Sequence, residues 1–183
     1  MQGIDIQETL RAVHAAVMGA TAPEWLFLVA ICGLAALALL LRAGRHRRAR
    51  ARNVVLLDGS NIMYWRGGTP DIATLRAVIA QVAAQGLTAG VVFDANAGYK
   101  LEGRYLGHAA LARRLDLPPQ RVIVVNRGEV ADGLLLRAAR DYRARVVSND
   151  RFRDWAEDFP EVARPGFLIA GRFRDDALEL DIA

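Results

Sequence analysis

Residues 54–61 read VVLLDGSN, so that four apolar residues run directly into an acid, a glycine, a hydroxyl and an amide. A short apolar run bounded by turn residues is typical of a buried strand in a parallel sheet. The end of such a strand carries Asp58 and Asn61 to the carboxyl edge of the sheet, where open α/β folds build their sites. The sequence therefore predicts a functional site that begins at Asp58.

Further apolar runs follow at regular intervals, and stretches with helical periodicity separate them. We expect strands at 53–57, 89–93, 121–125, 145–147 and 167–170, and a last edge strand at 177–182. Strands that alternate with helices indicate right-handed βαβ units around a central, mostly parallel sheet. Residues 53–183 are therefore predicted to form one α/β domain, and their number suffices for a filled core.

The chain before this domain has a different composition. Residues 25–41 contain 17 residues without a charge, which is the short end of the roughly 17–25 residues that span a membrane. We predict a transmembrane helix here, with a buried core helix and a cleaved signal peptide as the alternatives. Residues 1–24 are predicted to form a short amphipathic segment.

Six arginines lie within 42–52, whereas 1–24 hold one arginine and three acids. Basic residues stay on the cytoplasmic side, so we expect the N-terminus outside and a cytoplasmic catalytic domain. Residues 25–52 would then contact membrane lipid, with RNA phosphates as the alternative partner of the arginines. Basic and acidic residues are equal in number beyond 52, so the sequence pI of about 9.8 reflects this linker.

Acids stand at several junctions that should open on one edge of the sheet. Asp58 and Asp94 follow strands, Asp132 lies in the first turn of a predicted helix, and Asp150 follows the fourth strand. Asp154 lies one helical turn after Asp150, on the same face if a helix runs from Phe152 to about Asp158. Converging carboxylates repel one another without a cation, and an oxygen-only cluster suits Mg²⁺ or Mn²⁺. Each acid taken alone could instead cap a helix.

Several other chemistries lack their residues. There is no G-x-x-x-x-G-K-[ST] loop for nucleotide phosphates and no G-x-S-x-G nucleophile elbow. Cys32 is the only cysteine, so spacing supports neither a disulfide framework nor a zinc site. The chemistry is therefore expected to come from carboxylates and a metal ion.

Three motifs occur in order: DGSNIMYW at 58–65, VADGLLLRAA at 130–139 and VVSNDRFRDW at 146–155. Together they resemble the NYN branch of the PIN-like nucleases, and within it the regnase-type ribonuclease domain found beside CCCH zinc fingers. The resemblance implies a three-layer PIN-like α/β fold and Mg²⁺-dependent endonucleolytic cleavage of single-stranded RNA. Zinc-finger cysteines are absent, and Ala131 stands where the animal enzymes often carry an additional acid.

The resemblance also implies roles for particular residues. The catalytic set would be Asp58, Asn61, Asp132, Asp150 and Asp154. The metal ligands among them would be Asp58, Asp132 and Asp150, with Asp94 as an additional acid. Contacts to RNA would come from Ser60, Ser148, Asn149, Arg104, Arg151 and Arg153, and the alternative for Arg151 and Arg153 is that they pair with neighbouring acids. Tyr64 and Trp65 could stack an unpaired base or pack over the first loop.

These observations predict a membrane-anchored, metal-dependent endoribonuclease that cleaves single-stranded RNA with activated water. One alternative is a non-catalytic RNA-binding or docking module at the membrane. Another is a metal-dependent phosphatase or DNA nuclease, because one fold can host several activities. The sequence leaves open the RNA target, the number of metal ions and the oligomeric state, a homodimer included.

Overall fold

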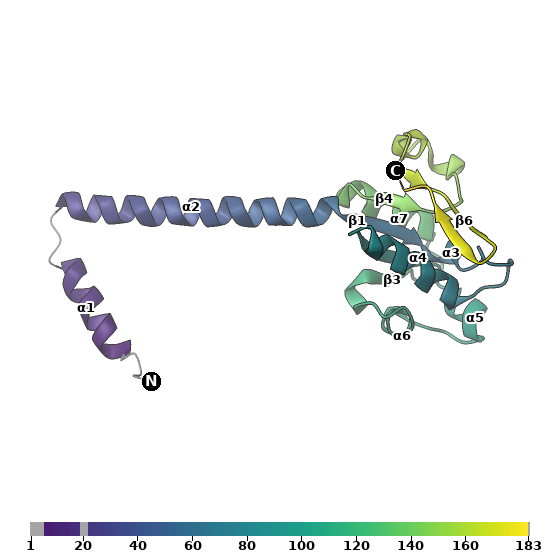
Figure 1. The fold of residues 1–183 in the computed structure, drawn as a ribbon, viewed down its shortest axis with the longest axis horizontal. Coiled ribbons are helices and arrows are strands. Elements are labelled where there is room, and N and C mark those ends of the chain that lie inside the picture. The colour runs from purple at the N-terminus through teal and green to yellow at the C-terminus, as the bar shows by residue number, and fades with distance from the viewer. Residues whose placement is uncertain (1–5, 19–21, 183) are drawn as a thin grey trace. The chain divides into compact units, whose positions relative to one another are not determined.

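The computed structural model of the protein describes residues 6–18 and 22–182. The chain divides into two compact units, residues 1–48 and 49–183, and each is described by itself. The first contains helix α1 (Ile6–Met18) and most of helix α2 (Ala22–Arg52), which Figure 1 labels. Of the predicted N-terminal segment, α1 is helical as expected, and residues 1–5 and 19–21 lie outside the described residues.

Helix α2 corrects the prediction for this region. It is 31 residues long and continues through 42–52, where a linker was expected. Among the residues that the structure describes, no helix combines the length and the apolar character needed to cross a membrane. The physical reason is that the uncharged run has only the minimum length of a membrane span and is followed directly, within the same helix, by an arginine-rich segment. The prediction of a single-pass anchor with a cytoplasmic catalytic domain is therefore wrong, whereas lipid contact through 25–52 stays a prediction.

The second unit is built on a five-stranded sheet with the order β3-β2-β1-β4-β5, in which every pairing is parallel. Its strands are β1 (Val54–Asp58), β2 (Thr88–Phe93), β3 (Val122–Val124), β4 (Arg145–Val147) and β5 (Leu168–Ile169). The predicted central, mostly parallel sheet is thus confirmed. Apolar β-branched residues dominate these strands because helices cover both of their faces.

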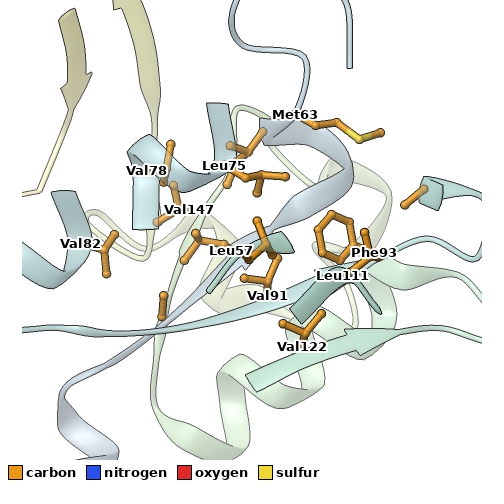
Figure 2. Packing of buried hydrophobic residues seen from close by; sticks show 14 of the residues in the cluster. Leu57, Met63, Leu75, Val78, Val82, Val91, Phe93, Leu111, Val122 and Val147 are labelled. Carbon is orange, nitrogen blue, oxygen red and sulfur yellow. The ribbon is translucent and has the colours of Figure 1, made fainter. Parts of the chain in front are cut away.

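Successive residues of β1 point to opposite faces of the sheet, as the pleat requires. Val55 and Leu57 belong to one buried cluster, whereas Leu56 belongs to the other. The first cluster includes residues of α4 (Ile72–Ala84) and α6 (His108–Arg114), and the second includes residues of α7 (Ala131–Tyr142). Figure 2 shows Leu57 and Val91 in the first cluster, with Leu75 of α4 nearby.

Several short helical elements lie between the strands and the longer helices, and some of them contain residues of the site. They are α3 (Gly59–Ile62), α5 (Ala97–Glu102), and the 3₁₀ turns η1 (Pro119–Arg121), η2 (Arg153–Trp155) and η3 (Pro160–Ala163). The prediction of a helix from Phe152 to Asp158 is wrong. Phe152 has a φ of 48°, and this left-handed backbone interrupts a helix before η2 begins.

The C-terminal strands also differ from the prediction. Strand β7 (Ala177–Leu180) pairs antiparallel with β6 (Gly171–Arg174) in a separate hairpin, instead of extending the edge of the main sheet. Asp175 and Asp176 both have positive φ, which gives the tight turn that connects two such strands. Figure 1 shows this hairpin in yellow.

The strand order determines where a site can form. From β1 the chain continues to β2 and β3 on one side, and it then returns to β4 and β5 on the other side. The direction therefore reverses between β1 and β4, and at such a switch point the loops after the two strands separate and leave a crevice. Asp58 closes β1, and Ser148 follows β4 directly.

Candidate active site

Asp58 is the buried acid at the switch point, with 8% of its surface exposed. Its Oδ1 accepts the backbone N–H of Asn61 at 3.1 Å, which caps the start of α3. Its Oδ2 accepts the hydroxyl of Ser148 at 2.9 Å, a contact that joins β1 to β4. Gly59 allows this close turn, because a Cβ there would lie 2.5 Å from the ring of Phe93. Both oxygens of Asp58 are thus held by the protein.

Ser148 connects two acids through one hydroxyl. Its Oγ donates to Asp58 and accepts the backbone N–H of Asp150 at 3.1 Å. Asp150 in turn accepts the backbone N–H of Phe152 at 2.8 Å, which supports the left-handed conformation of that residue. Ser148 is buried and its hydroxyl is used on protein groups, so it holds the carboxylate of Asp58 close to the backbone of Asp150.

Asn61 and Asn149 hold the backbone around these acids. The side-chain oxygen of Asn61 accepts the indole N–H of Trp65 at 2.8 Å and the backbone N–H of Asn149 at 3.1 Å. The amide of Asn149 pairs with the backbone of Gly171 in both directions, at 2.8 and 3.0 Å. Trp65 therefore packs in the protein rather than facing solvent, and its ring lies against Gly171. The segment after β4 is fixed to α3 and to β6.

Asp132 lies in the first turn of α7, half-buried, and its side chain forms a hydrogen bond with Trp155. The indole packs on Gly133, where a Cβ would lie 2.7 Å from the ring. Sequence reasoning did not select Trp155. A glycine inside an otherwise good helix indicates a close approach by another group, so Gly133 was the available signal.

The acids influence one another electrostatically. Burial raises the pKa of Asp58 to about 6, and the charges of Asp132 and Asp94 raise it as well, against hydrogen bonds from Ser148 and Asn61 that lower it. Burial also raises the pKa of Asp132, and the charges of Asp150 and Asp94 add to this effect. The fold therefore brings Asp58, Asp94, Asp132 and Asp150 within electrostatic reach of one another.

The carboxylate oxygens of these acids are the kind of ligand that a hard divalent cation such as Mg²⁺ prefers. Within residues 6–18 and 22–182, no three His, Cys, Asp or Glu side chains lie close enough to form a complete cage. Mg²⁺ does not need one, because it typically uses one or two carboxylates and keeps several waters. A cation would also relieve the repulsion that raises the pKa of Asp58 and Asp132.

The remaining predicted residues lie around these acids or away from them. Ser60 uses its hydroxyl to accept the backbone N–H of Asp94 at 2.8 Å. Arg104 pairs with Glu102 at 3.0 Å, whereas Arg151 and Arg153 are exposed and form no ion pair among the described residues. Asp154 is exposed on η2, and its charge is not among those that raise the pKa of Asp58 or Asp132.

Fold and site together define an α/β domain with an acidic cluster at the switch point of a parallel sheet. The chain belongs to the Zc3h12a-like ribonuclease NYN domain family, whose model matches residues 51–166. This confirms the resemblance to the NYN nucleases that the three motifs indicated. A comparison with curated proteins gives no match.

Solved structures support the fold. The chain is similar to the crystal structure of nuclear proteinaceous RNase P 2 (PRORP2) from A. thaliana, with 14% identity and a TM-score of 0.55 over 72% of this chain and 30% of that chain. It is also similar to a structure of Arabidopsis thaliana nuclear protein-only RNase P 2, with 15% identity and a TM-score of 0.52 over 85% and 35%. At these identities the likeness is one of fold. The chain spans about a third of the length of those proteins.

Proposed function

We propose that this protein is a metal-dependent endoribonuclease that cleaves single-stranded RNA at the β1–β4 switch point. One observation carries the proposal. In a chain of a ribonuclease domain family, the hydroxyl of Ser148 joins the carboxylate of Asp58 to the backbone of Asp150, and the charge of Asp132 raises the pKa of Asp58. Evolved sites accumulate such acids where a cation and a phosphodiester bind together.

Asp58, Asp132 and Asp150 would hold Mg²⁺ or Mn²⁺, directly or through waters that the ion keeps, and Asp94 would add negative charge beside them. When bound, the ion would polarise the phosphodiester and activate water for in-line attack. The residues around the acids supply positioning. Ser148 orients the carboxylate of Asp58 and fixes the backbone of Asp150, and the indole of Trp155 orients Asp132. Such supporting contacts fix the direction in which ligand oxygens point.

Asn61 belongs to the same proposal as a positioning residue, since its oxygen ties the backbone of Asn149 to α3. Ser60 and Asn149 use their side chains on protein groups and would likewise hold the loops in place. Asp154 is proposed to act at the rim of the site, where it is exposed.

Arginines are the proposed contacts to RNA phosphates. Arg151 and Arg153 flank the turn after Asp150 and are exposed, and Arg104 lies on the loop after α5. Phosphate contacts position a strand without reading its sequence. A homodimer stays a prediction.

The experiment uses the full chain with a labelled single-stranded RNA in Mg²⁺, Mn²⁺ or EDTA. Asp58→Asn and Asp150→Asn are tested beside the wild type, and Asp141→Asn is the matched control, an exposed acid on α7. We expect cleavage that needs the ion, falls by about 10³-fold in both site variants, and persists in the control. Equal cleavage by all four chains would contradict the proposal.

Other outcomes would replace the proposal with a different function. Cleavage of DNA or of phosphomonoesters without cleavage of RNA would indicate another reaction on the same fold. RNA binding without cleavage under any of these conditions would indicate a binding module.

A further inference from the structure

A pocket lies beside the acidic cluster, on the β2–β3 side of the same carboxyl edge. Its volume is about 550 Å³, within the range of about 300–1,000 Å³ that suits small ligands. The residues that line it are Ala95, Asn96, Tyr99, Tyr105, Val125, Asn126 and Arg127. Ala95 directly follows Asp94, and Val125 pairs with the end of β2 through its backbone N–H. The pocket thus begins one residue away from the proposed site.

The two tyrosines of the pocket, Tyr99 and Tyr105, expose most of their surface to solvent. Tyr99 is 57% exposed and Tyr105 is 62% exposed. Next to Tyr99, Gly98 is so close to the following loop that a Cβ would lie 2.4 Å from the backbone nitrogen of Leu106. Leu106 is itself buried. The helix that carries Tyr99 therefore packs directly against the residue that follows Tyr105, while both rings remain accessible to solvent.

The polar groups of the pocket have capacity for a ligand. Asn96 precedes α5, but its side chain makes no capping hydrogen bond. The side-chain nitrogen of Asn126 donates to Glu129 at 3.2 Å, so its oxygen is the atom that can accept from a ligand. Arg127 is exposed and forms no ion pair among the described residues. Aromatic faces, amides and one guanidinium are the groups with which proteins hold unpaired bases and their phosphates.

We propose that this pocket binds one unpaired nucleobase of the RNA strand, next to the phosphate that lies over the acidic cluster. Tyr99 and Tyr105 stack on the base, Asn96 and Asn126 contact its edge, and Arg127 contacts the adjacent phosphate. The inference rests on the proposed function, because it takes RNA as the substrate. It goes further by assigning a base-binding site on the β2–β3 side, and this site would set which nucleotide flanks the cleavage position.

The test measures RNA binding separately from cleavage. Binding of a fluorescent single-stranded RNA of fixed sequence is measured with the full chain carrying Asp58→Asn, in Mg²⁺. Onto this chain we place Tyr99→Ala with Tyr105→Ala, and, as a matched pair, Tyr99→Phe with Tyr105→Phe. Tyr142→Ala, which removes an exposed tyrosine of α7 outside the pocket, is the control.

Stacking on an aromatic ring contributes enough that the double alanine variant should bind about 10- to 100-fold more weakly. The double phenylalanine variant and the Tyr142 control should stay within about threefold, because they keep the pocket's rings. A set of RNAs that each lack one base should reveal one position whose loss weakens binding to the tyrosine chain but not to the alanine chain.

Two results would overturn the inference: equal RNA binding by the alanine and tyrosine chains, or equal losses in the phenylalanine and alanine chains. The wild-type chain tells the two proposals apart. Cleavage of RNA with no dependence on either tyrosine would refute the pocket and leave the nuclease. Ring-dependent binding of one base by a chain that cleaves nothing would support the pocket and refute the nuclease.

Discussion

The two halves of the carboxyl edge are built differently, although they belong to one sheet. On the β1–β4 side, Asp58, Ser148 and Asn61 use their side chains on neighbouring groups of the protein. On the β2–β3 side, Tyr99 and Tyr105 project more than half of their surface into solvent. The polar side chains of the first half are held by hydrogen bonds within the protein, whereas the aromatic rings of the second half are open to solvent.

The difference follows from what each half is proposed to do. Groups that act on a reacting phosphate must be held in place before the substrate arrives, because reorganisation during the reaction costs free energy. Groups that stack on a base gain by being exposed until the base covers them. The three predictions below test how far the first half depends on these contacts.

The largest expected effect concerns the charge of Asp58. Its pKa rises from an ordinary value of 3.8 to about 6, so the folded protein keeps this proton where the unfolded chain has lost it. Stability is therefore lost as pH rises from about 4 to about 6, by about 3 kcal/mol in total. Urea unfolding of the metal-free full chain should show this loss, and Asp58→Asn should lack it.

Added Mg²⁺ provides the complementary measurement. It should stabilise the wild type at pH 7, where Asp58 is ionised, and have little effect at pH 4.5. If the free energies of unfolding of the wild type and of Asp58→Asn differ by the same amount from about pH 4 to about pH 6, Asp58 is not buried as described.

A smaller effect is expected from two serine hydroxyls, that of Ser148 after β4 and that of Ser60 in α3, which reaches the backbone of Asp94 after β2. Ser148→Ala removes a donor to Asp58 and an acceptor of Asp150, so RNA cleavage should fall by about 10- to 100-fold. Ser60→Ala removes only the acceptor of the Asp94 backbone and should cost less. Steady-state cleavage rates at several Mg²⁺ concentrations would decide this, and a larger loss in Ser60→Ala would reverse the comparison.

The smallest effects separate two neighbours on η2. Trp155→Phe removes the hydrogen bond that lowers the pKa of Asp132, so the pH dependence of cleavage should shift upward and activity should fall about threefold to tenfold. Asp154→Asn, on an exposed side chain, should change the rate by less than about threefold. A pH–rate profile of both variants tests this, and a larger loss in Asp154→Asn would restore that acid to the centre of the site.

Much of the second unit could be predicted from local signals. Short apolar runs followed by Asp58, Asp94 or Asp150 predict buried strands with acids at their carboxyl ends, because residue periodicity and turn residues are signals that extend over only a few positions. The parallel pairing of these strands followed from the alternation of strands and helices, whereas the order of the strands did not.

Other features depend on contacts between distant residues and could not be predicted in this way. The helical period places Asp154 beside Asp150, but the Asp150 carboxylate supports a left-handed Phe152 that breaks the period. Likewise, the sequence suggested a span at 25–41 followed by a separate linker at 42–52. In the structure, helix α2 continues through both segments. The partner of Asp132 is Trp155, which no spacing rule would select.

The hydrogen bond between Asp58 and Ser148 joins residues 90 positions apart in the chain. A polypeptide grows from its N-terminus, so during synthesis β1 exists long before β4 is available to pair with it. Until then the nascent chain carries its acids but no assembled switch point. The proposed nuclease would thus lack its catalytic geometry while its own messenger is being translated, and would gain that geometry only when the sheet is completed.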